Sequence, residues 1–590
     1  MVLRQPSSML RREWMVQTVL ATGFVSSYSH ALALAERIDA SLDTEPVELQ
    51  DKPKEESPKS EDKPRSVTTE MVRAAAWMSR VELTDAHCEE IAGKLSLKAA
   101  SIFALRKTSI EENTPMAMAF VPSYFTPSQP QFGKKETIPE RISPWEKSVL
   151  QRVSLPEMSK IEQAAFWTIE QQALGLRSKR FTSEELTRMY LDRLKRFDPE
   201  LLCVVSYYDR AIDDAKKADA ELAAGIDRGM LHGIPWGAKD IISIPGTKTT
   251  WGAIDYQDRV RDVMATVAQR MDQAGAVLLA KLTVGTLAWG DQWFGGMTRS
   301  PWNPKAGSSG SSAGSSSAVA AGLCSFAIGS ETLGSIVSPT RACSTCGLRP
   351  SFGRVSRYGC MTLGWSMDKI GPIGRTVMDC VWVFSKMIGG DGKDPTVVNM
   401  PFEWPLSELQ IDRIRFGISP QARGSERAAA ELLLENGAKQ VEIEFPADPR
   451  ISAMTDAISV EAATMHGELF ASIEKDEQIG KWAPTFREAQ FCSAIDYVQA
   501  MRARVALIQE TERVLQQVDV YIGDGDLARM NLTGHPSLVV AFGEESARKR
   551  PRTVVLTGAY FRESILLDVG DWIQEQSNPN PSQPELTRVE

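Results

Sequence analysis

The chain has 590 residues and a mass of 65.1 kDa, and its 43% hydrophobic and 24% charged residues exclude disorder throughout, because they allow a large buried core. Its 67 basic and 76 acidic residues give a formal net charge of −9, which argues against a nucleic-acid-coating surface, since such surfaces carry basic stripes. Eight cysteines are too few for a disulfide scaffold, and five histidines without metal-ligand spacing favour a mechanism whose base is not histidine.

The first 35 residues have the parts of an export signal. Arg4 and the pair Arg11-Arg12 precede an apolar stretch over residues 14–25, and small-residue sites follow over 31–35. The arginine pair resembles a twin-arginine signal, so we expect export to the periplasm or the cell surface. The alternative is an ordinary amphipathic helix on a cytoplasmic protein. No segment has the roughly 18 uninterrupted apolar residues of a membrane helix, so no stable membrane span is predicted.

Residues 36–66 are expected to form a disordered linker, because the stretch 44–66 has four prolines, mixed charge and no aromatic residue. A helical N-terminal extension follows over residues 67–155. Within it, Thr84 is the expected N-cap of a helix over 85–97, and the Pro-rich stretch 122–156 is expected to be irregular. The remainder is divided into a catalytic domain over 156–576 and a flexible tail over 577–590.

Helical and strand-like segments alternate within residues 156–576. Helices are expected at 161–174, 183–197, 211–224, 262–274, 426–435 and 563–573, with a mostly helical stretch over 461–516. Strands are expected at 235–242, 276–282, 325–328, 413–418, 440–445, 519–522, 537–541 and 553–557. This alternation predicts an α/β fold with a parallel or mixed sheet.

Residues 307–317 read GSSGSSAGSSS, which out of context is typical of a flexible linker. The stretch lies between the expected strands at 276–282 and 325–328 and runs directly into a helix-forming segment at 318–323, which argues against a linker. A phosphate-binding loop needs a lysine after the glycines, and none follows here. What remains is a loop of small residues that allows close approach of backbone and hydroxyl groups.

A second small-residue loop over 329–336 and a lysine at the end of an apolar strand complete the pattern. Lys239 ends the stretch GIPWGAK, where burial is expected to lower its pKa. A neutral amine is a competent base.

Together these segments resemble the amidase signature family in order, spacing and text. The matching motifs are GIPWGAKD (233–240), GSSAGS (310–315), GSETLGSIVSP (329–339), GLRPSFGRVSRYG (347–359), DKIGPIGRTVMD (368–379) and NLTGHP (531–536). The resemblance is close over residues 160–400 and weak over most of the rest. It implies an α/β/α fold with a large mixed, mostly parallel sheet covered by helices on both faces. It also implies amide hydrolysis without metal or cofactor.

The resemblance implies a Ser–cis-Ser–Lys triad. By position, Ser335 is the nucleophile, Ser311 is the bridging serine with the cis peptide bond, and Lys239 is the base. A serine hydroxyl needs a partner that removes its proton, and a neutral lysine can do so through Ser311. The reverse transfer protonates the leaving amine.

The same resemblance places an oxyanion hole at the backbone N–H groups of Thr332, Leu333, Gly334 and Ser335. Ser312 is a supporting candidate, and Glu331 is expected to fix the loop rather than to act as a catalytic carboxylate.

Three positions depart from the family pattern. Family members mostly have Asp where Glu331 stands, Gly where Leu333 stands and Arg where Val337 stands. Arg341 is the expected replacement for the charge that Val337 removes. None of the triad positions is altered, which favours an active enzyme.

Other candidates are given structural interpretations. Cys343 and Cys346 form a CxxC without a second ligand pair, so they are expected to pack in the core. His232 is expected to be structural, and His535 either lines the pocket or packs with hydrogen bonds. Trp289 and Trp293 are expected to line the substrate pocket, together with Leu333 and residues 395–530.

These observations favour an amidohydrolase that acts alone on a small-molecule amide, without nucleic acid. A homodimer is compatible with the sequence. The first alternative is an A-subunit-like protein of a glutamine-dependent amidotransferase, against which the N-terminal extension and the lack of basic clusters argue. The second is a catalytically inactive binding scaffold, suggested by Leu333 and Val337.

Overall fold

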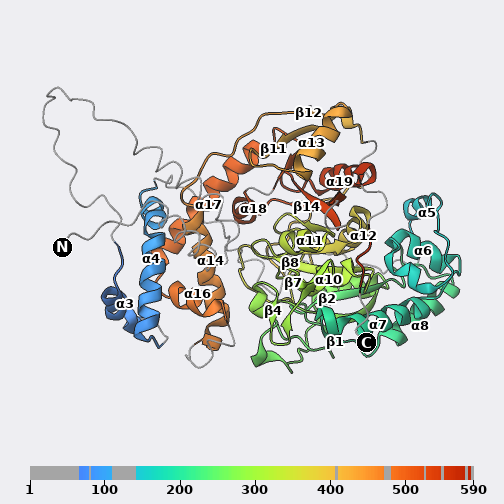
Figure 1. Cartoon of the computed structure of the whole chain (residues 1–590), viewed down its shortest axis with the longest axis horizontal. Coiled ribbons are helices and arrows are strands. Elements are labelled where there is room, and N and C mark those ends of the chain that lie inside the picture. The colour runs from blue at the N-terminus through green and yellow to red at the C-terminus, as the bar shows by residue number, and fades with distance from the viewer. Residues whose placement is uncertain are drawn as a thin grey trace. The chain divides into compact units, whose positions relative to one another are not determined.

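The computed structural model describes residues 66–78, 82–108, 141–404, 409–470, 480–523, 526–545, 550–577 and 582–586. The predicted export signal, the linker and the first part of the Pro-rich stretch lie outside the described residues, as does most of the predicted tail, and these stay predictions. Residues Arg65–Glu590 form one compact unit. Figure 1 shows its arrangement, with a central sheet surrounded by helices.

An 11-stranded sheet forms the centre of the catalytic part. Its spatial order is β1 (Val204–Tyr207), β3 (Val277–Leu282), β2 (Pro235–Lys239), β8 (Phe326–Glu331), β10 (Lys369–Gly374), β9 (Cys346–Arg349), β14 (Ser537–Glu545), β15 (Arg550–Thr557), β13 (Val520–Ile522), β11 (Arg415–Ile418) and β12 (Lys439–Gln440). Two short ribbons stand apart, β4 (Gln292–Trp293) with β5 (Gly296–Met297) and β6 (Arg299–Ser300) with β7 (Asn303–Gly307). The predicted strand at 440–445 is wrong except for Gln440, which lies in β12.

The sheet is mixed, as predicted, but it is not mostly parallel. The parallel pairs are β2–β3, β2–β8, β11–β12 and β11–β13. The antiparallel pairs are β1–β3, β8–β10, β9–β10, β9–β14, β14–β15 and β13–β15. The strands β14 and β15 are separated by only a few residues, and so short a connection reverses the chain, whereas a parallel pair needs a crossover of about a dozen residues.

Helices cover both faces of the sheet, and the alternation along β14 shows it. The side chains of Leu538 and Val540 point towards Gly570 of α19 (Glu563–Ser577). Val539, which lies between them, packs with Val337 of α11 (Val337–Cys343) on the opposite face. The helix α10 (Ala313–Ala320) shares the face of α11, and α12 (Val377–Met387) shares the face of α19.

The remaining helices are α5 (Pro144–Leu150), α6 (Ile169–Arg177), α7 (Ser183–Leu201), α8 (Ala211–Ala223), α9 (Thr266–Gln273), α13 (Ser425–Glu435) and α18 (Leu527–Thr533). The helices α7, α8 and α13 begin within one residue of a predicted start, whereas α5 and α18 have no predicted counterpart. The predicted helix at 161–174 is divided into a 3₁₀ turn (Ile161–Phe166) and α6, because Thr168 caps a new helix by accepting a hydrogen bond from the backbone N–H of Gln171. The stretch 122–156, predicted to be irregular, contains α5, which a Ser143–Glu146 capping box begins.

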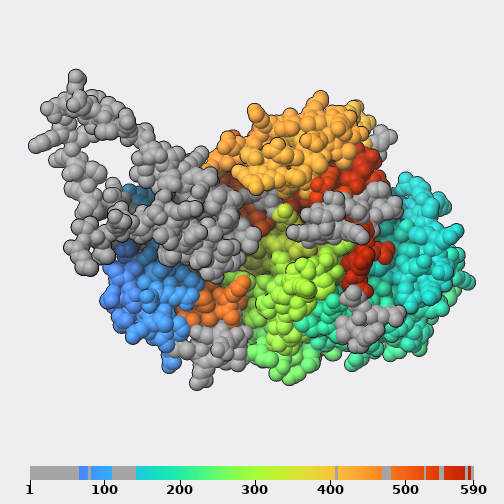
Figure 2. Space-filling view, in the orientation of Figure 1, coloured from blue at the N-terminus to red at the C-terminus, as the bar shows by residue number. Residues whose placement is uncertain are grey.

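A group of helices packs beside the sheet. It comprises α3 (Thr69–Ala75), α4 (Asp85–Arg106), α14 (Ile451–His466), α16 (Trp482–Ala489) and α17 (Ala494–Leu515). Thr84 is the N-cap of α4, as predicted, and α4 extends beyond the predicted end to Arg106. The helix α4 contacts α14, α16 and α17, and in Figure 2 its blue surface adjoins the orange surface of these helices. None of the helices in the described residues is long and apolar enough to cross a membrane.

Candidate active site

The Gly/Ser segment is a fixed loop rather than a linker. It leaves β7 at Gly307 and enters α10 at Ala313, and the Gly310–Ser311 peptide bond is cis. A Cβ on Gly310 would lie 1.8 Å from the carbonyl oxygen of Gly290, so this position requires glycine. The carboxylate of Asp291 accepts a hydrogen bond from the backbone N–H of Ser309 at 3.0 Å. The chain therefore holds Ser311 in one place.

Lys239 lies at the end of β2 and is fully buried. Its Nζ is 2.8 Å from Ser311 Oγ, 3.0 Å from Ser312 Oγ, and 2.8 and 3.1 Å from Oγ and O of Ser330. A neutral amine has two N–H groups and one lone pair, so it can donate to two of these oxygens and accept a hydrogen bond from one hydroxyl. Burial lowers the pKa of Lys239 to about 7, although Asp368 and Glu331 act to raise it.

Ser335 lies in the loop that precedes α11. Its carbonyl oxygen accepts a hydrogen bond from the backbone N–H of Ser312 at 3.1 Å, which ties this loop to the one that carries Ser311. Ser335 is 8% exposed, whereas Ser311, Ser312 and Lys239 are fully buried. Of the three predicted triad residues, the nucleophile is therefore the one that retains contact with solvent.

Glu331 fixes the nucleophile loop, as the sequence predicts. One carboxylate oxygen accepts hydrogen bonds from the backbone N–H groups of Ile336 and Val337 at 2.7 and 2.9 Å, and the other accepts from Arg349 Nη1 at 2.7 Å. Burial acts to raise the pKa of Glu331, but Arg349 and Lys369 together bring it down to about 2. Glu331 is thus a buried, ionised anchor at the start of α11.

Arg349 belongs to the site, although it is not among the predicted site residues. Its position in the motif GLRP could have indicated it. It lies on β9 and is fully buried, and its Nη2 donates to the carbonyl oxygen of His535 at 2.9 Å and to Ser537 Oγ at 2.6 Å. The cation bound to Glu331 is Arg349. Burial lowers the pKa of Arg341, and the nearby charge of Glu426 acts to raise it. That Arg341 replaces the charge lost at Val337 stays a prediction.

The predicted oxyanion segment forms a tight turn. Gly334 has a φ of +82°, which favours glycine, and Leu333 is free of that requirement, so its Cβ imposes no strain there. Thr332 Oγ1 donates to Asp368 Oδ1 at 2.6 Å, and Lys369 Nζ donates to the carbonyl oxygen of Thr332 at 3.4 Å. The local sequence does not predict these contacts, because Asp368 and Lys369 reach Thr332 only through the pairing of β10 with β8.

Two histidines have structural surroundings. His232 lies 3.1 Å from a carboxylate oxygen of Glu221. His535 is buried between Thr533 Oγ1 and Glu512 Oε2, at 2.7 and 2.9 Å, which confirms its packed, hydrogen-bonded interpretation.

Cys343 and Cys346 are both buried, in agreement with the prediction that they pack in the core. In the described part of the chain, no cluster of three or more His, Cys, Asp or Glu residues could hold a metal ion.

The predicted pocket walls lie against the helical group. Leu333 packs on a cluster with Met367, Met454 and Met501, and the ring of Trp289 is 4.5 Å from that of Trp482 on α16. Their role in substrate selection stays a prediction.

Comparison with known families agrees with this arrangement of fold and loops. The family model Amidase matches residues 185–524. The chain therefore belongs to the amidase family.

The similar proteins include amidotransferase chains and amidases. The chain is 32% identical to the A subunit of glutamyl-tRNA(Gln) amidotransferase from Roseiflexus castenholzii, over 71% of this chain and 97% of that protein. It is 29% identical to the protein of the same name from Thermosynechococcus vestitus, over 69% and 97%. Among solved structures, native peptide amidase from Stenotrophomonas maltophilia superposes with a TM-score of 0.63 and 25% identity, over 72% of this chain and 99% of that chain.

Proposed function

We propose that this protein hydrolyses a carboxamide C–N bond, with Ser335 as nucleophile, Ser311 as bridging serine and Lys239 as base. The observation that carries the proposal is the placement of Lys239, which is fully buried and has Nζ 2.8 Å from Ser311 Oγ. A lysine in that position can be neutral near neutral pH, because burial lowers its pKa to about 7. Such an amine can accept a proton that a serine must lose.

The proposed reaction has two halves. Lys239 takes the proton of Ser311 as Ser311 takes that of Ser335, and Ser335 Oγ bonds to the amide carbon. Backbone N–H groups of the segment 332–335 bind the resulting oxyanion. The C–N bond then breaks, and the proton returns through Ser311 to the leaving nitrogen. Water, deprotonated by the same relay, attacks the acyl-enzyme and releases the carboxylic acid and Ser335.

A panel of aliphatic and aryl amides tests this proposal through release of ammonia or amine. We expect the purified wild type to act on members of the panel, Ser335→Ala to abolish release, and Lys239→Ala to abolish nearly all of it. Ser385→Ala, on α12, is the matched control and should behave like wild type. Equal activity of wild type and Ser335→Ala, with a covalent serine probe labelling neither, would exclude the proposal, and no activity in either protein would leave the inactive scaffold.

A second candidate is an A-subunit-like protein of a glutamine-dependent amidotransferase, favoured by the names of the similar sequences. In that case glutamine would be the ammonia source, and activity would require a partner chain. One observation argues against this candidate. The similarity covers 97% of one such protein but only 71% of this chain, so the rest of this chain has no counterpart in that protein. Turnover of simple amides by the chain alone would favour the hydrolase, and glutaminase activity only with added partner would favour the alternative.

A further inference from the structure

Lys369 is a buried lysine that the proposed reaction does not use. It is the first residue of β10 and pairs across the sheet with Glu331 of β8. It is 2% exposed, and its Nζ donates a hydrogen bond to the carbonyl oxygen of Thr332 at 3.4 Å. Lysine is rarely buried without a specific partner, because burial of its amine is costly. The contact of Lys369 with this carbonyl therefore indicates a specific role.

A hydrogen bond to Glu331 does not supply that role, although the charge of Glu331 acts to raise the pKa of Lys369 against the effect of burial. One oxygen of this carboxylate already accepts from Arg349, and the other accepts from two backbone N–H groups, all at 2.7–2.9 Å. Glu331 is therefore satisfied without Lys369. The hydrogen bond of Lys369 goes instead to the peptide group that joins Thr332 to Leu333.

Asp368 and Lys369, at the start of β10, hold Thr332 by its side chain and by its carbonyl group. Lys369 holds its carbonyl oxygen, and Asp368 accepts from the Thr332 hydroxyl at 2.6 Å. Asp368 is in turn fixed by the backbone N–H groups of Leu363 and Gly364, at 2.8 and 3.1 Å. The orientation of the peptide plane is thus set from outside the loop.

The consequence for Leu333 follows from peptide geometry. In a trans peptide the C=O and N–H bonds point in opposite directions, so a donor on the Thr332 oxygen leaves the Leu333 N–H pointing away from Lys369. A hydrogen bond to the carbonyl also polarises the peptide and strengthens its N–H as a donor, and the effect is larger in a buried, low-dielectric place.

We propose that Lys369 is a positioning residue of the oxyanion hole, which orients and polarises the Thr332–Leu333 peptide so that the Leu333 N–H binds the developing negative charge. This rests on the proposed function, in which that N–H is an oxyanion donor. Lys369 acts through the peptide and touches no reacting atom. Its contribution therefore belongs to the transition state and not to substrate binding.

Lys369→Met tests this proposal, because it keeps the length of the side chain and removes the donor. With the best amide of the panel, we expect kcat to fall about 10- to 100-fold and KM to change less than about twofold, since loss of one oxyanion donor typically costs about 100- to 1000-fold. Phenylboronic acid, which forms a tetrahedral adduct with a nucleophilic serine, should bind more weakly by a similar factor. Lys369→Arg should recover part of both losses.

Two further variants keep the result interpretable. Lys439→Met, an exposed lysine on the edge strand β12, is the matched control and should behave like wild type. Thr332→Val removes the contact with Asp368 and should lower kcat and phenylboronic acid affinity in proportion, which tests the same peptide if Lys369→Met does not fold.

The outcomes separate this proposal from the proposed function. Unchanged kcat and phenylboronic acid affinity in Lys369→Met, with Ser335→Ala inactive, would overturn the role of Lys369 alone. A fall in kcat accompanied by an equal rise in KM and a lower melting temperature, without recovery in Lys369→Arg, would also overturn it, because that is the behaviour of a structural residue. Full activity of Ser335→Ala would overturn the proposed function itself.

Discussion

The ionisation of Lys239 sets the pH dependence of the proposed reaction. Its pKa lies at about 7 because the side chain is buried, and only the neutral amine can accept a proton. We therefore expect kcat/KM to be low below pH 7, to rise through about 7 and to level off above it. Lys239→Arg, which stays protonated, should lose about 100- to 10,000-fold at every pH. A pH–rate profile from about pH 5.5 to 9 on one amide measures both.

A profile that falls with rising pH through 7, or an active Lys239→Arg with an unchanged profile, would contradict the role of Lys239 as base.

At the scale of single residues, the motifs predicted Lys239, Ser311, Ser335 and the fixing role of Glu331. They could not predict Ser330 beside the amine or Lys369 beside the Thr332 carbonyl. These contacts depend on the register between β8 and its neighbours, and periodicity along one strand does not encode that register.

The connection between β8 and α11 carries the nucleophile, and Glu331 holds it in place. Glu331 ends β8, caps the start of α11 and binds Arg349 of β9, so one carboxylate joins three elements. We expect Glu331→Gln to lower the free energy of unfolding by about 3 kcal/mol, because it leaves Arg349 buried without its charge partner. Urea unfolding measures the change, and kcat should fall as the loop shifts.

A double-mutant cycle with Arg349→Met tests whether the pair itself is responsible. The double variant should be less destabilised than the sum of the two single variants, since neither charge is then left alone. Additive effects would show that the two side chains act independently.

Sequence patterns predicted the strand and the loop on either side of Glu331. They did not predict its partner Arg349, because that residue lies on another strand of a sheet whose order is fixed by long connections.

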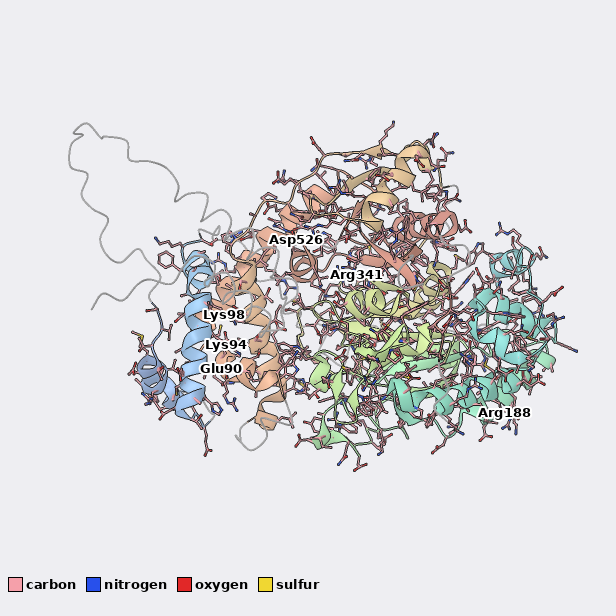
Figure 3. All side chains as sticks on the ribbon, in the orientation of Figure 1. Glu90, Lys94, Lys98, Arg188, Arg341 and Asp526 are labelled. Carbon is pink, nitrogen blue, oxygen red and sulfur yellow. The ribbon has the colours of Figure 1, made fainter. Side chains whose placement is uncertain are left out.

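At the scale of the whole compact unit, α4 near its N-terminal end packs against helices from the C-terminal half of the chain. Lys98 of α4, labelled in Figure 3, pairs with Asp456 of α14 at 2.9 Å and also with Glu488 of α16. The helices α14 and α17 in turn hold Ser366, two residues before Asp368, through Glu461 and Arg504. The helix α4 is therefore connected by direct contacts to the loop that fixes the Thr332 peptide. Local sequence patterns predicted the helix but not its partner surface, because the packed segments are hundreds of residues apart.

Leu105→Ala tests whether α4 is part of the cooperative core. Leu105 is 2% exposed and packs with Met367, Met454 and Met501, so its truncation should destabilise the protein by about 2–4 kcal/mol. Leu97→Ala, on the same helix but at a position 78% exposed, is the matched control and should change stability by less than about 0.5 kcal/mol. Urea unfolding followed by tryptophan fluorescence and by amide turnover should show both signals shifting together in Leu105→Ala. If turnover kept its wild-type midpoint while the fluorescence shifted, α4 would unfold independently of the catalytic site.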